Sequence, residues 1–309
     1  MNRDPRPRKR LGLRDLVAAG PRAMWRYTGT LLGVFVVQSI VAAACMLAVA
    51  LVLAQTFAKL PLFDDAVDGD PVALVYCLRY GHVSFAAIGG IVLAIVLFWQ
   101  LCSWFLVGGI FGVLSQQPDG RRATARSFGA AGASTYLTYA RLALCALPGW
   151  VLSLFVLGVG LTVARAHNEY PLTLTELFVP ILLGALPAIL LLHLFWTVED
   201  YARAELTLRG DSHDPGVIAT YLRSFAYVLR RPVTLVHGAL GWLAFLLVTL
   251  AYAYLAAGHP MYGSSGAVTL FVARSGVALV RLAIRFGVLG GQIELARTRP
   301  PPPRKSGDD

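Results

Sequence analysis

Polar side chains collect at the end of one apolar segment, His193-Leu-Phe-Trp-Thr-Val-Glu-Asp200. His193, Thr197 and Asp200 would share one face of a helix, because their spacing is i, i+4 and i+7. Glu199 would lie to the side of that face. A histidine and two carboxylates at the mouth of a transmembrane helix suit a proton relay or a polar substrate pocket. The same groups also suit a structural ion pair between packed helices, and both interpretations stay open.

Three arginines, Arg274, Arg281 and Arg285, interrupt a second apolar segment. On a helix they fall within about 40° of one another. This narrow stripe favours a helix that crosses the bilayer, because a helix lying in the membrane plane needs a broad polar face. The arginines cost about 8–10 kcal/mol of insertion, and the apolar residues of the segment offset about 4–7 kcal/mol. We therefore expect the stripe to be buried, with Arg281 or Arg285 paired to Asp200 or Glu199.

Patterns typical of enzymes and metal sites are missing from the sequence. The six histidines are scattered without an H-x-x-x-H or H-E-x-x-H spacing, and the four cysteines form no C-x-x-C pair. No phosphate-binding loop, nucleophile elbow or dinucleotide-binding glycine motif occurs. We therefore expect no catalytic residues, no cofactor and no bound metal.

The composition is typical of an integral membrane protein. Of the 309 residues 57% are hydrophobic and 14% charged, whereas a soluble domain carries about 25% charged residues. Six apolar runs are long enough to cross about 30 Å of hydrocarbon. They cover residues 29–57, 83–115, 135–164, 177–198, 233–257 and 267–291. We expect an all-α, polytopic transmembrane bundle of six spans over residues 29–291, between a basic segment (1–28) and a disordered Pro/Arg-rich tail (292–309).

The basic residues are distributed unequally about these six spans. Of the 27 Lys and Arg residues, 20 lie in the segments on one side and three on the other. Such an excess marks the cytoplasmic side, so both termini should be cytoplasmic. Arginine greatly outnumbers lysine and alanine is abundant, which points to a GC-rich bacterial source and hence to the cytoplasmic (inner) membrane.

An amphipathic inner-leaflet helix is expected before spans one, three and five. The first covers residues 11–26, the second 128–141 and the third 215–231. Helices of this kind bind anionic lipid through basic residues beside an apolar face. No nucleic-acid-binding motif accompanies the basic residues, so lipid is the expected partner. In the third helix the residues expected at the lipid surface are Phe225 and Leu229, flanked by Arg223, Arg230 and Arg231.

Small residues at four-residue spacing recur in the spans. The pairs are Gly29 and Gly33, Gly108 and Gly112, and Gly287 and Gly291. Pairs like these allow helices to approach closely in lipid, so we expect helix contacts at these positions.

Four short motifs carry a resemblance to known proteins. They are Gly108-Gly-Ile110, Phe128-Gly-Ala-Ala131, Trp196-Thr-Val-Glu-Asp-Tyr-Ala-Arg203 and Tyr221-Leu-Arg-Ser-Phe225. The chain resembles uncharacterised bacterial six-span membrane proteins and is loosely similar to the membrane domain attached to some glycerophosphodiester phosphodiesterases. The resemblance implies a six-span fold with inner-leaflet helices. It implies no activity, because the residues outside the spans are too few for the phosphodiesterase barrel.

Two functions are consistent with these features. The first is a non-catalytic membrane protein that organises lipid or partner proteins, including further copies of itself, at the inner leaflet. The second is a transporter of a small solute or lipid that uses the polar inner mouth of spans four and six. Helices broken near the midplane, for which Pro148 and Pro187 are candidates, would favour transport.

Overall fold

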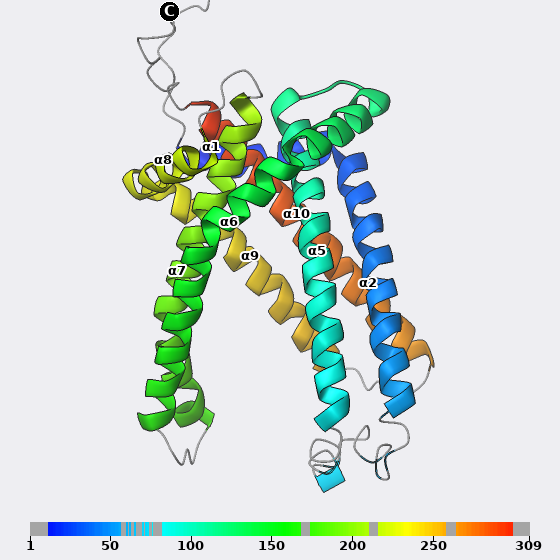
Figure 1. The fold of residues 1–309 in the computed structure, drawn as a ribbon. Helices are drawn as coiled ribbons and strands as arrows, with labels where there is room; N and C mark the ends of the chain where they lie inside the picture. Colours follow the sequence, from blue (N-terminus) through cyan, green and yellow to red (C-terminus); the bar gives the residue numbers. More distant parts are fainter. Residues whose placement is uncertain are drawn as a thin grey trace, which may run out of the picture. The chain divides into compact units, whose positions relative to one another are not determined.

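The computed structural model describes residues 12–56, 82–167, 174–209, 216–257 and 264–298, together with isolated positions between 60 and 76. Within this part the regular structure is entirely helical, as the sequence predicts (Figure 1). The helices are α1 (Leu13–Arg26), α2 (Thr28–Thr56), α5 (His82–Gln116), α6 (Arg121–His167), α7 (Leu174–Arg209), α8 (Val217–Arg230), α9 (Pro232–Ala257) and α10 (Ser264–Arg297).

Five of these helices, α2, α5, α6, α7 and α9, are long and apolar enough to cross a membrane. Large apolar side chains along them are exposed rather than packed against protein, for example Phe155, Leu182 and Leu247. Exposed apolar surface on this scale belongs against lipid. The chain is therefore a multi-pass membrane protein. The sixth predicted span lies on α10, which is long enough but is set apart from the other five by its three arginines.

The chain forms two compact units. One comprises Leu32–Leu106, which includes most of α2 and the first part of α5. The other comprises Met1–Leu31 and Val107–Asp309, and therefore holds α1, the last turns of α5 and all of α6 to α10. The residues with predicted functional roles all belong to this second, larger unit.

Glycines set the closest helix contacts of the larger unit. A Cβ atom on Gly160 of α6 would overlap the carbonyl oxygen of Gly184 of α7, so these two helices meet backbone to backbone. Helix α1 crosses α10 at Gly20 and Gly287, where a Cβ on Gly20 would lie 3.2 Å from the Gly287 carbonyl oxygen. Of the predicted pairs, those of α5 and α10 are confirmed as helix contacts. A Cβ on Gly29 or Gly33 would meet no described atom within 4 Å, so the prediction is wrong for that pair.

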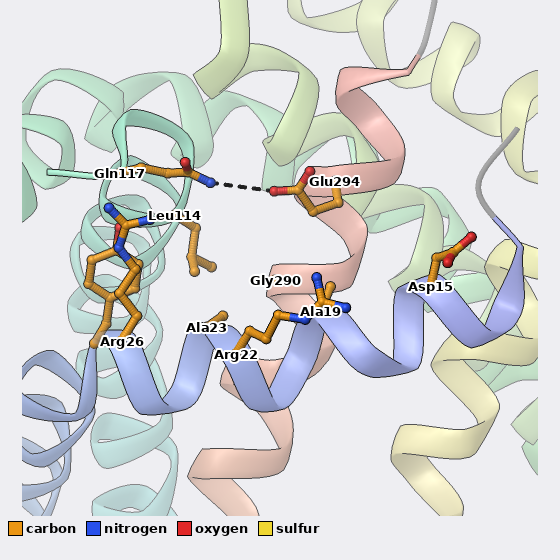
Figure 2. A pocket seen from close by; sticks show the side chains of 10 residues that line it. Asp15, Ala19, Arg22, Ala23, Arg26, Leu114, Gln117, Gly290 and Glu294 are labelled. Carbon is orange, nitrogen blue, oxygen red and sulfur yellow. Dashed lines mark hydrogen bonds between the residues drawn. The ribbon is translucent and has the colours of Figure 1, made fainter. Parts of the chain in front are cut away.

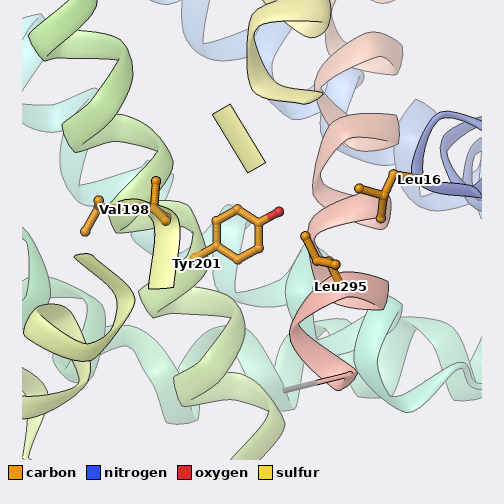
Figure 3. Packing of buried hydrophobic residues seen from close by; sticks show 5 residues of the cluster. Leu16, Val198, Tyr201 and Leu295 are labelled. Atoms are coloured by element: carbon orange, nitrogen blue, oxygen red, sulfur yellow. The ribbon is translucent and has the colours of Figure 1, made fainter. Parts of the chain in front are cut away.

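The apolar core of the larger unit lies where several helix ends converge. Leu16 of α1, Val198 and Tyr201 of α7, Val228 of α8 and Leu295 of α10 form one buried cluster (Figure 3). We call these five residues the end core. Distant parts of the chain are thereby held together at one end of the helices.

Two of the three predicted surface helices exist as separate elements. They are α1 and α8, each 14 residues long. The third prediction, a distinct helix over residues 128–141, is wrong, because α6 is continuous from Arg121 to His167. No proline or turn-forming residue separates residue 141 from the apolar run that follows, so the helix has no reason to end there.

The last helix extends beyond the predicted end of the membrane domain. Helix α10 continues through Arg297, whereas the tail was expected to begin at residue 292. Gln292, Ile293 and Leu295 are buried, which explains why this stretch stays helical. The remainder of the predicted tail, from residue 299 onward, lies outside the described residues.

Candidate functional site

Asp200 of α7 and Arg285 of α10 form a bidentate ion pair. Arg285 Nη1 donates to Asp200 Oδ2 at 2.7 Å, and Arg285 Nη2 donates to Oδ1 at 2.6 Å. The amide nitrogen of Gln292 donates to Oδ2 at 3.3 Å. Asp200 is only 1% exposed, so almost all of its solvation comes from these partners. The pairing predicted between the arginine stripe and the acids of α7 is thus present, with Arg285 and Asp200 as the pair.

Glu199 forms an ion pair with a residue of its own helix. Arg203 lies one turn further along α7, and its Nη2 contacts Glu199 Oε1, while its Nη1 lies 3.7 Å from Asp200 Oδ1. Two carboxylates and two guanidinium groups, from Glu199, Asp200, Arg203 and Arg285, therefore form a charge-balanced network. Arg203 was missed in the sequence, although its i+4 spacing from Glu199 was the signal for it.

A third buried acid, Glu205, links α7 to α8. It pairs with Arg209 on α7, and Arg223 Nη2 of α8 lies 3.7 Å from its Oε1. Ser224 Oγ donates to Glu205 Oε2 at 3.4 Å. Arg223 was expected only at the lipid surface, but part of its charge is committed to this contact with α7. Glu205 was also missed, because a carboxylate past the end of a predicted span gives no signal of burial.

The rest of the arginine stripe is not buried. Arg274 and Arg281 are exposed, and neither makes a hydrogen bond or ion pair with another described residue. The prediction that the whole stripe is buried and paired is therefore wrong for these two. Arg274 lies eleven residues, about 16 Å of helix, from Arg285, so the single acid Asp200 reaches only one end of the stripe.

The guanidinium groups near the inner end of α10 lie over aromatic rings. Arg285 Cζ is 5.3 Å from the centre of the Trp196 ring, and Arg281 Cζ is 5.1 Å from that of Phe245. The negative face of a ring attracts the cation, in addition to the carboxylate of Asp200 at Arg285 and without a carboxylate among the described residues at Arg281.

His193 does not join the acids. Its Nε2 lies 3.0 Å from the carbonyl oxygen of Leu235 on α9, and Thr197 Oγ1 donates to the His193 carbonyl oxygen. A Cβ on Gly238 would lie 2.9 Å from the His193 ring, so this glycine lets α9 approach α7. His193 thus joins two helices, and the proton relay suggested by the spacing is not assembled with Asp200.

Helix α8 presents three different faces, separated by roughly 120°. Thr220, Ser224 and Val228 are buried against the rest of the unit. Ile218, Leu222 and Leu229 are 66%, 61% and 55% exposed on a second face. Arg223 and Arg230 lie on the third. Leu229 is exposed as predicted, whereas Phe225 is partly buried and stacks on Phe195 of α7 with ring centres 6.2 Å apart.

Helix α1 has the same three-faced organisation. Leu16 and Gly20 are buried, and Val17 and Trp25 are exposed, Trp25 by 83%. The third face, with Asp15, Arg22 and Arg26, lines a pocket of about 330 Å³ between α1 and the ends of α5 and α10 (Figure 2). Arg26 is paired there with Asp119 at 2.8 Å, and Gln117 Nε2 donates to Glu294 at 3.5 Å.

Comparisons with protein-family models, with curated proteins and with solved structures find no match. The likeness to phosphodiesterase membrane domains therefore stays a prediction. Within the described residues no three His, Cys, Asp or Glu side chains are grouped so that they could hold a metal ion. The site is thus defined by its own geometry, which combines an ion-pair network with two three-faced helices.

Proposed function

We propose that this chain is a six-span, non-catalytic protein of the bacterial cytoplasmic membrane that organises anionic lipid at the inner leaflet. The observation that supports this proposal most directly is the three-faced organisation of α8, which is repeated in α1. One face packs on protein, one exposes large apolar side chains and one bears arginines. Such a helix is stable where protein, hydrocarbon and water meet, which is the edge of a bundle at the membrane surface.

The end core supports the six-span topology. Val233 and Leu235, at the start of α9, pack against the end core, and Leu295, near the end of α10, belongs to it. If α9 crosses the membrane, as its length and apolar character suggest, a return crossing by α10 accounts for the presence of Leu295 in the same cluster. The burial of Leu16 in this cluster puts the N-terminal segment on the same side.

The charge of that side supports anionic lipid as the partner. The segments that meet in the end core are those in which the sequence concentrates its basic residues. Each arginine close to an anionic leaflet contributes about 1 kcal/mol of attraction. Arg230 and Arg231, both exposed at the end of α8, are well placed for this attraction.

Transport through the inner mouth of α7 and α10 is the second candidate. The buried network around Asp200 and Arg285 favours it, because ionisable groups inside membranes often serve transport. Against it, α6 runs unbroken through Pro148, and α7 runs unbroken through Pro180 and Pro187. Transporter sites are typically built at discontinuous helices, so the lipid-organising function is favoured.

The test measures the phospholipids that remain bound after mild detergent extraction. Replacing Arg230 and Arg231 by Gln should lower the ratio of anionic to zwitterionic lipid, because α8 loses its attraction for the anionic leaflet. Arg165→Gln, an exposed arginine at the other end of the bundle, is the matched control and should leave the ratio unchanged. An unchanged ratio in the α8 variant would contradict the proposal.

A further inference from the structure

A continuous row of aromatic rings connects the two inner arginines of α10. Arg285 lies over Trp196, and the Trp196 and Trp242 ring centres are 5.3 Å apart. Trp242 contacts Phe245 at 5.8 Å, and Arg281 lies over Phe245. We call these five residues the arginine–aromatic cluster. It joins α7, α9 and α10, all within the larger unit.

The two arginines of this cluster differ in how their charge is neutralised. Arg285 is committed to Asp200, whereas Arg281 is exposed and has only the Phe245 ring against it among the described residues. No acid among the described residues is paired with Arg281, and residues 215–293 of the sequence contain neither Asp nor Glu. The nearest acids along α7, Glu199 and Asp200, are already paired.

The depth of Arg281 favours an anionic partner from outside the chain. Arg281 lies one helical turn, about 6 Å, further into the membrane than Arg285. An unpaired guanidinium there is costly unless it reaches toward the headgroups or meets an anionic partner. The nearest anion that the membrane supplies is the phosphate of an inner-leaflet phospholipid, toward which the long arginine side chain can extend. Guanidinium binds phosphate through two parallel hydrogen bonds.

The surroundings of Arg281 suit a lipid rather than a soluble anion. Trp242, Leu246 and Leu250 are exposed on α9, and the spacing of the three places them on one face of the helix. Tryptophan favours the headgroup level, and the leucines below it provide an apolar surface for an acyl chain. We infer that Arg281 binds the phosphate of one phospholipid molecule, whose acyl chains lie along α9. This inference rests on the proposed function and adds a discrete site to it.

Native mass spectrometry of the full chain, titrated with phosphatidylglycerol, tests the site. Arg281→Gln should weaken binding of the first lipid by about tenfold or more, the loss expected for a charge-assisted pair. Arg274→Gln is the matched control, since it removes an exposed arginine of the same stripe that has no ring contact among the described residues. It should leave first-lipid binding unchanged. Equal first-lipid affinity in the wild type and in Arg281→Gln would overturn the inference.

A second variant keeps the charge of Arg281 and removes the aromatic ring that lies against it. Phe245→Leu should weaken first-lipid binding by about two- to fivefold, because the cation loses the ring that positions it. A thermal melt followed by tryptophan fluorescence establishes that each variant is folded. If glycerol phosphate displaces the first lipid at equal concentration, the site recognises a soluble phosphate and the lipid assignment fails.

The outcomes separate this site from the broader proposal. If Arg281→Gln leaves the first lipid bound while the α8 double variant lowers the retained anionic lipid, the discrete site fails and the proposed function stands. If Arg281→Gln removes the first lipid while the α8 variant changes nothing, the site stands and the surface-helix function fails.

Discussion

At the scale of single residues, the buried charges of α7 are arranged so that none is isolated. Asp200 accepts hydrogen bonds from Arg285 and Gln292 of α10, and Glu199 forms an ion pair with Arg203 of its own helix. A buried pair of this kind is costly to break, because removal of one partner leaves an uncompensated charge. The network therefore fixes the rotation of α10 against α7 more than it adds to total stability.

A double-mutant cycle on this pair should show strong coupling. Asp200→Asn and Arg285→Leu should each destabilise the protein by about 3–5 kcal/mol, and the double variant should recover part of that loss. Thermal unfolding in detergent provides the measurement. Arg281→Leu is the control and should be at least as stable as the wild type, since no acid among the described residues is paired with it. Strict additivity of the two substitutions would show that the pair is not formed.

At the scale of helices, close packing depends on glycines at particular crossings and not on glycine content as such. Gly160 and Gly184 face each other at the α6–α7 contact, whereas Gly158, two residues away, has no described atom near its Cβ position. In lipid, where apolar side chains gain little by leaving the solvent, such backbone contact is a principal source of helix association.

Alanine substitution should affect stability differently at these two glycines. Gly160→Ala should lower stability by about 1–3 kcal/mol, because the new methyl group forces α6 away from α7. Gly158→Ala should be neutral or stabilising by up to about 1 kcal/mol, because alanine is the better helix former. Melting temperatures in the same detergent would decide the matter, and similar shifts for both variants would argue against the crossing.

The faces of α8 are also open to direct measurement. Nitroxide labels at Ile218 and Leu222 should be accessible to oxygen, which concentrates in hydrocarbon, and protected from a water-soluble nickel chelate. A label at Arg230 should show the opposite preference, because its face points to water. If all three labels respond alike to the two reagents, α8 does not lie at the membrane boundary.

At the scale of the whole molecule, the proposed sidedness of the chain rests on the end core and the distribution of charge together. The end core and the side chains packed on it come from segments before α2, from the last part of α7 to the start of α9, and at the end of α10. These segments carry most of the basic residues. The end core supports a common side of the membrane for these segments, and the excess of basic residues supports the proposal that this side is the cytoplasm.

Cysteine labelling in spheroplasts tests this topology. On a background without Cys45, Cys77, Cys102 and Cys145, a cysteine replacing Arg165 should react with a membrane-impermeant reagent from outside. A cysteine replacing Ser306 should react only after permeabilisation. External labelling at position 306 would rule out the even number of crossings.

The sequence by itself determined the helical class, five of the six predicted spans and the presence of α1 and α8. Hydropathy and amphipathic periodicity are local properties, so they can be determined for each segment without knowledge of its tertiary contacts. It also placed the acids of α7 and an arginine of α10 at a similar depth, because depth follows from counting residues along a span.

Only the tertiary structure decided which side chains meet. The choice of Arg285 over Arg281, the turn of Phe225 toward Phe195 and the burial of Glu205 all depend on how each helix is rotated about its axis. That rotation is set by contacts between distant segments, such as Gly20 with Gly287. A one-residue shift along a helix turns a side chain by about 100°, so depth alone leaves the partner undetermined.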